Sequence, residues 1–90
     1  MRTVQMMSGV TTNTSSAIQT ILGSQRETYV WQMSLTGTAS VVFEGSFNGT
    51  TFFTMATKSA SAIFTTESVP YLRVTSSGTS GATINIWVGV

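Results

Sequence analysis

Apolar and polar residues alternate along several short segments, the pattern of a β-strand with one buried face. Between residues 28 and 36 the apolar members of the pattern are Tyr29, Trp31, Met33 and Leu35. The C-terminal segment repeats it with Ala82, Ile84, Ile86, Val88 and Val90. In a third segment, one face of the predicted strand carries Val41, Phe43, Gly45 and Phe47. The periodicity therefore predicts an all-β protein.

Turn-forming residues separate these segments. Asn48-Gly49 is typical of a type I′ hairpin, because both residues tolerate positive φ. Gly37-Thr38 and the Ser/Gly-rich residues 77–81 indicate two further turns. The strands are expected near residues 3–7, 17–22, 28–36, 39–47, 51–55, 60–65, 69–76 and 82–89. This spacing predicts one domain over residues 1–90, an antiparallel sandwich of about eight strands that is jelly-roll-like or Ig-like.

The first third of the chain is less regular. Ile18, Ile21 and Leu22 fit either a strand or a short helix, since their spacing suits both periods. Residues 8–16 are rich in Ser and Thr and predict a loop. As an alternative, residues 1–16 form an extended N-terminal arm that reaches onto a neighbouring subunit.

The composition is unusual for a freely soluble domain. The chain has only 7 charged residues, 4 basic and 3 acidic, while 30 of its 90 residues are Ser or Thr. It contains no Cys and no His, so disulfides and the commonest metal ligands do not stabilise it. Such a surface suits a protein that packs against copies of itself, with a Thr-rich monomeric sandwich as the alternative.

The same composition disfavours several functions. No run of Lys or Arg follows a phosphate backbone, no apolar stretch approaches membrane-spanning length, and the N-terminus lacks the apolar core of a signal peptide. The hydroxyl groups have no His to activate them, and the three glutamates are not clustered. We therefore expect a non-enzymatic protein without catalytic residues, metal or cofactor, and no nucleic-acid or membrane partner.

A contact surface is predicted around Trp87. This side chain shares a face with Asn85, opposite the buried isoleucines, and either lies against its own sheet or anchors an interface. Tyr71 and Arg73 share a face of another predicted strand. If the two strands pair, these four residues form one patch, so the interface prediction is Tyr71, Arg73, Asn85 and Trp87.

Three motifs resemble those of a known class of proteins. Residues 41–52 (VVFEGSFNGTTF) are similar to a hairpin of small bacteriophage structural β-sandwich proteins. Residues 70–75 (PYLRVT) and 80–86 (SGATINI) are similar to their final strands. The resemblance covers residues 29–90 and is greatest to capsid decoration (cement) proteins. It implies a homotrimer bound to the phage major capsid protein on the capsid surface of the virion, made in the host bacterial cytoplasm.

Two other functions remain open at this point. The chain could occupy another virion position, as a tail or fibre component. Alternatively, it could be a carbohydrate-binding module, because sandwiches with exposed Trp and Tyr stack on sugar rings.

Overall fold

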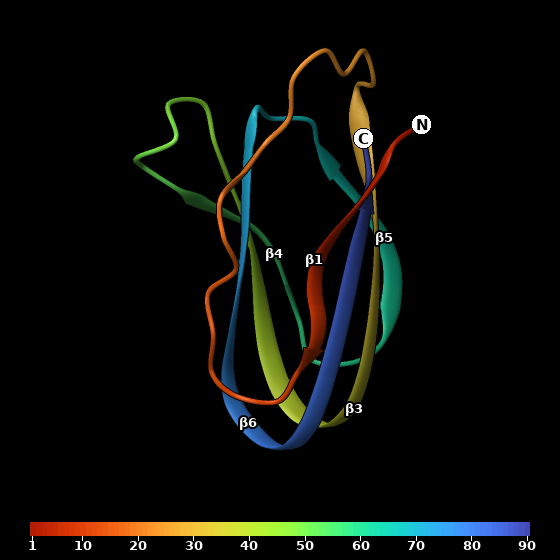
Figure 1. Cartoon of the computed structure of the whole chain (residues 1–90), viewed down its shortest axis with the longest axis vertical. Helices are drawn as coiled ribbons and strands as arrows, with labels where there is room; N and C mark the ends of the chain where they lie inside the picture. The colour runs from red at the N-terminus through yellow and green to blue at the C-terminus, as the bar shows by residue number, and fades with distance from the viewer.

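The periodic segments fold into six strands in a computed structural model that describes residues 1–90 (Figure 1). The strands are β1 (Thr3–Val10), β2 (Gln19–Thr20), β3 (Thr28–Ser46), β4 (Phe53–Lys58), β5 (Ala62–Glu67) and β6 (Tyr71–Gly89). They form a single antiparallel sheet that does not close into a barrel. The all-β prediction is confirmed. The helical alternative for residues 17–22 is wrong, because the chain has no helix.

The two longest strands, β3 and β6, form the centre of the sheet. Each is 19 residues long, and they pair along most of their length. The pairing runs from Val30 opposite Gly89 to Ser46 opposite Tyr71, with register shifts near residue 38. All other strands attach to this central pair, β1 and β2 to β6 and β4 and β5 to β3.

Each central strand bends near its middle instead of ending in a turn. Gly37 in β3 has a φ of 77°, and Gly78 and Gly81 in β6 have φ of 59° and 57°. Glycine adopts this left-handed backbone at little cost, so the hydrogen-bonded ladder continues through the bend. The strands predicted at 28–36 and 39–47 are therefore fused into β3, and those at 69–76 and 82–89 into β6. Six strands replace the eight expected.

The bends fold the sheet over on itself into two facing layers. The first layer contains β1, the second half of β6, the first half of β3, and β5; the second contains β2, the first half of β6, the second half of β3, and β4. Figure 1 shows the U-turns of β3 and β6 at the lower end of the molecule. Both termini and the loops 21–27, 47–52 and 68–70 lie at the other end, which we call the loop end.

The hydrophobic core lies between the two layers. Trp31 and Phe43 lie on β3 on either side of its bend, and their ring centroids are 5.1 Å apart. Phe64 from β5 packs 4.8 Å from Phe43 and 6.3 Å from Trp31. The indole N–H of Trp31 donates a 2.8 Å hydrogen bond to the hydroxyl of Thr66. The core is therefore an aromatic cluster with its one buried indole donor satisfied.

The alternation predicted most of this core. All five apolar residues of the C-terminal pattern are buried, as are Tyr29, Trp31 and Met33, while Leu35 is half-buried. Phe47 is the exception, since it was expected to face the core and is 81% exposed. The reason is that β3 ends at Ser46, so the alternation does not extend to Phe47.

The Asn48-Gly49 prediction of a type I′ hairpin is wrong. Gly49 has a φ of 75°, but Asn48 does not have positive φ, and the connection between β3 and β4 is a longer loop. The Asn48 side-chain oxygen accepts 2.9 Å hydrogen bonds from the backbone N–H groups of Thr50 and Thr51. The Ser46 hydroxyl accepts from the N–H groups of Asn48 and Gly49. Side chains thus replace the backbone bonds of a tight turn.

Residues 1–16 are part of the sheet and do not extend from it as an arm. Strand β1 pairs with the second half of β6, and the residues that follow lie along its first half. The Ser76 N–H donates to the Thr14 carbonyl and the Ser16 N–H to the Val74 carbonyl, each at 2.8 Å. The buried Ser76 hydroxyl donates to the Thr12 carbonyl at 2.9 Å. These bonds satisfy an edge of β6 that would otherwise be unpaired.

Candidate functional site

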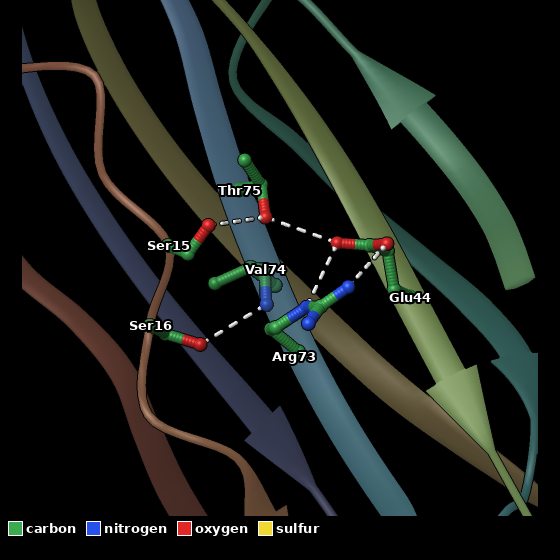
Figure 2. Close-up of polar contacts among 6 residues, drawn as sticks. All are labelled: Ser15, Ser16, Glu44, Arg73, Val74 and Thr75. Atoms are coloured by element: carbon green, nitrogen blue, oxygen red, sulfur yellow. Dashed lines mark hydrogen bonds and ion pairs between the residues drawn. The ribbon is translucent and has the colours of Figure 1, made fainter. Parts of the chain in front are cut away.

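The only ion pair in the structure joins Glu44 of β3 to Arg73 of β6, which are directly opposite each other in the ladder. Arg73 Nη2 lies 3.0 Å from Glu44 Oε2, and Arg73 Nε lies 3.2 Å from Glu44 Oε1 (Figure 2). The Thr75 hydroxyl donates a third hydrogen bond to Glu44 Oε1 at 3.0 Å. The guanidinium also lies over the Phe52 ring, 4.3 Å from its centroid. Two-point pairing of this kind fixes the geometry of both side chains.

These contacts keep both groups ionised at neutral pH. Hydrogen bonding from Arg73 lowers the pKa of Glu44, and the Thr75 bond adds to this, while partial burial of the carboxylate opposes it. Hydrogen bonding to Glu44 raises the pKa of Arg73. A carboxylate bound in this way is a poor general acid or base at neutral pH. The pair therefore acts as a cross-strand clamp in the second layer.

We expect Glu44→Gln to lower the free energy of unfolding by about 1 kcal/mol at pH 7, the range of a partly exposed two-point ion pair. Because the folded state lowers the Glu44 pKa, its stabilisation is present above about pH 4.3, the ordinary glutamate value, and is lost as the pH falls through the lower folded value. Urea unfolding between pH 2.5 and 7 measures this. Glu27→Gln, at an exposed residue without an ion pair, is the control. An identical pH profile for wild type and Glu44→Gln would contradict the assignment.

The ion pair also connects to the segment before β2. The Ser15 hydroxyl lies 3.0 Å from the Thr75 hydroxyl, and the Ser16 hydroxyl accepts a hydrogen bond from the Val74 N–H at 3.0 Å. Figure 2 shows a continuous chain of contacts from Ser15 through Thr75 to Glu44. This network helps to hold the segment along the edge of β6 in the second layer.

The four residues of the predicted interface do not form one patch. All lie on β6 and alternate with buried residues, so all face outward. However, Tyr71 and Arg73 precede the bend and Asn85 and Trp87 follow it. The first two are on the outer face of the second layer, and the other two are on the outer face of the first. The single patch required the predicted strands 69–76 and 82–89 to pair side by side. They are instead the two halves of β6, on either side of its bend.

Three of these residues have contacts within the chain. Arg73 pairs with Glu44, and the Asn85 side-chain oxygen accepts a 2.9 Å hydrogen bond from the Gly9 N–H. The Tyr71 ring packs against Gly49, where an added Cβ would lie 3.2 Å from the ring. These side chains therefore stabilise the fold as it stands, whatever further contacts they make.

Trp87 is half-buried and sits in the middle of the first layer's outer face. Gln5 on β1 and Gln32 on β3 are its direct neighbours in the ladder. It lines a shallow depression of about 190 Å³ together with Met1 and Ile63. This face combines an aromatic ring with flanking amide groups and carries a 73% exposed isoleucine.

The largest concave surface was not predicted from the sequence. It is a groove of about 660 Å³ at the loop end, between the β3–β4 loop and residues 67–69. Phe47 and Phe53, 81% and 71% exposed, line it together with Met55 and Val69. The sequence did contain one indication of an exposed aromatic side chain. The adjacent Phe52 and Phe53 must point to opposite sides of an extended chain. Phe52 lies under Arg73, and Phe53 faces the groove.

Neither surface contains a group of metal-ligating side chains. No group of three His, Cys, Asp or Glu side chains is placed to hold a metal ion, and no helix is long enough to cross a membrane. What the surfaces offer is exposed aromatic and aliphatic area with hydroxyl and amide groups around it. No protein-family model, curated protein or solved structure matches the chain.

Proposed function

We propose that this chain is a non-enzymatic structural protein that acts by assembly, as a capsid decoration protein of a bacteriophage virion. It binds the major capsid protein and copies of itself on the capsid surface, and stabilises the lattice by bridging neighbouring subunits. Many weak contacts on a repeating lattice add up through multivalency. Such a role requires neither cofactor nor catalytic group.

One observation carries the proposal, the amount of exposed apolar side chain on a nearly uncharged surface. Only seven charged residues are spread over 4845 Å² of accessible surface, and two of them are paired with each other. The large hydrophobic side chains that remain exposed are Met1, Ile18, Leu22, Phe47, Phe53 and Ile63. Phe47 and Phe53 both line the groove at the loop end, and neighbouring exposed apolar side chains of this kind mark contact surfaces in soluble proteins. The resemblance of residues 29–90 to phage structural proteins favours a phage capsid as the assembly.

We also infer that the folded sheet is a jelly roll and not Ig-like. If the bends divide β3 and β6 into two strands each, eight strands form two layers of four. The first then pairs with the eighth, the second with the seventh, the third with the sixth and the fourth with the fifth. This nested pairing supports the jelly roll, in which one long antiparallel ribbon is wound into two layers.

Sedimentation with capsids tests the proposal. Undecorated capsids of the phage that encodes the chain are mixed with increasing protein and separated on a sucrose gradient. We expect the chain to sediment with the capsids, to saturate at a fixed number of copies per capsid, and to raise the temperature at which they disassemble. Capsids of an unrelated phage are the control. Protein that stays at the top of the gradient at every concentration would contradict the proposal.

A second candidate function, saccharide binding, is favoured by the surroundings of Trp87. An indole ring between Gln5 and Gln32 provides a stacking surface with hydrogen-bonding groups on both sides. If this function holds, a glycan array detects binding that Trp87→Ala abolishes. Decoration without saccharide binding predicts no glycan signal for either protein.

A further inference from the structure

The groove at the loop end needs an apolar occupant. Phe47, Phe53 and Met55 form its apolar wall, and the first two are among the most exposed hydrophobic side chains of the protein. The opposite wall carries Glu67, an exposed glutamate that forms no ion pair. A ligand that complements this groove presents an aliphatic group beside a positive charge.

The same chain carries such a group at the same end. Leu22, in the loop between β2 and β3, is 76% exposed. It shares a small surface depression with Arg2 and Val90, near the two chain termini. Arg2 is exposed and forms no ion pair. We call the projecting side chain of Leu22, with Arg2 beside it, the knob.

Charge complementarity favours a match between groove and knob. Glu27 lies close to Glu67, because its neighbour Thr28 is opposite Glu67 in the ladder and the Glu27 carbonyl accepts from the Ser68 N–H. Two of the three glutamates therefore lie on the groove side of the loop end. The third is already paired with Arg73. Opposite charges at the edge of an apolar contact select a partner orientation.

The positions of the knob and the groove determine whether Leu22 of the same chain or of a second copy can fill the groove. The knob adjoins β1 at one edge of the first layer, and the groove adjoins β4 at the opposite edge of the second. Both lie at the loop end, at opposite edges of the folded sheet. Leu22 therefore cannot fill the groove of its own chain, but a neighbour rotated about an axis along the strands can supply it.

We propose that the Leu22 knob of one copy inserts into the Phe47–Phe53 groove of the next, so that three copies close into a ring. Contacts between two different surfaces of identical chains form rings when the rotation closes. The inference deepens the proposed function, on which it rests for the trimeric state, by naming the contact that joins the copies. The ring places the three loop ends side by side.

Two single variants test the contact. Leu22→Asp removes the knob and Phe53→Asp removes the groove, and both change exposed side chains, so folding is retained and checked by circular dichroism. Each variant alone is expected to be a monomer by native mass. Ile63→Asp, at an equally exposed residue outside both features, is the control and stays a trimer. A trimer of Leu22→Asp or Phe53→Asp would overturn the proposal.

Mixing the two variants gives a sharper result. The Phe53→Asp variant keeps its knob, and this knob fits the groove that the Leu22→Asp variant keeps. The remaining knob and groove of the pair each carry a substitution and cannot bind a further copy. An equimolar mixture is therefore expected to form a dimer of one copy of each and nothing larger. A symmetric contact between identical surfaces would give no such dimer, and a purely monomeric mixture overturns the proposal.

A charge exchange tests the orientation. Arg2→Glu and Glu67→Arg are each expected to weaken the trimer about tenfold, and the double variant is expected to restore it, because the exchanged charges again face each other. Failure of the double variant to recover the trimer overturns the assigned orientation. Capsid sedimentation of the wild-type chain separates this inference from the proposed function. Capsid binding by a chain whose Leu22→Asp variant stays a trimer overturns only the ring contact, whereas a Leu22-dependent trimer that does not bind capsids overturns only the proposed function.

Discussion

Gly37→Ala is expected to lower the free energy of unfolding by about 2–5 kcal/mol, the combined range of left-handed strain and overpacking. Gly37 has a φ of 77° at the bend of β3, and an added Cβ would collide with the Gly81 carbonyl and lie 2.9 Å from the Ala82 Cα. These are backbone atoms of the paired strand, so no side-chain rotation relieves the contact. The two central strands would have to separate where both layers are joined.

Gly78→Ala is the matched control for this prediction. Gly78 also has positive φ, 59°, but an added Cβ would meet nothing within 4 Å. It should cost only the backbone strain, about 1 kcal/mol. Urea unfolding followed by tryptophan fluorescence measures both variants. Equal losses for Gly37→Ala and Gly78→Ala would show that close approach of the strands at the bend does not matter.

Trp31→Ala is expected to cost about 3–5 kcal/mol, the usual range for removing a fully buried aromatic side chain. Trp31 is inaccessible to solvent, contacts both Phe43 and Phe64, and connects the two halves of β3 through the core. A 90-residue domain has a total stability of roughly 5–13 kcal/mol, so this variant removes a large share of it. Thermal and urea unfolding measure the loss.

The controls for Trp31→Ala separate packing from hydrogen bonding. Trp31→Phe keeps an aromatic ring in the core but leaves the Thr66 hydroxyl without its indole donor, and should cost less than Trp31→Ala. Thr66→Val removes the acceptor and leaves the buried N–H unsatisfied, which should cost about 1–3 kcal/mol. A loss below about 1 kcal/mol for Trp31→Ala would contradict the aromatic core.

The sequence predicted the strands well because one face of each is buried. Alternation alone placed Trp31, Ile84 and Ile86 in the core, and all three are inaccessible to solvent. It could not distinguish a turn from a bend, because a glycine with positive φ serves both. Gly37 and Gly81 therefore indicated chain reversals, whereas the ladder passes through them.

The candidate surfaces were harder to predict, since they depend on which strands face outward in the same layer. The alternation correctly placed Tyr71 and Trp87 on outward-facing positions, but the bend of β6 puts them on opposite layers. The groove depends on where β3 ends. Because Ser46 turns inward to bond the loop, Phe47 leaves the core pattern and becomes exposed. No periodicity in the sequence marks that change.

The pairing of Glu44 with Arg73 shows a similar limit. Arg73 was expected to share a face of its strand with Tyr71, which is correct. The contact of Arg73 with Glu44 depends on the register between β3 and β6, which places the two residues directly opposite each other across 29 residues of chain. This register is set because the hydrogen-bonded ladder between β3 and β6 continues through the bend. Two separate hairpins would not have placed Glu44 opposite Arg73.

The central claim is that the protein works by assembling copies of itself, and its native mass tests this most directly. Sedimentation equilibrium of the wild-type chain over a wide range of concentrations is the measurement. We predict a single species with three times the 9.6 kDa mass of one chain, stable to dilution. A 9.6 kDa monomer at every concentration would contradict the account, because the exposed groove and knob would then have no partner in solution.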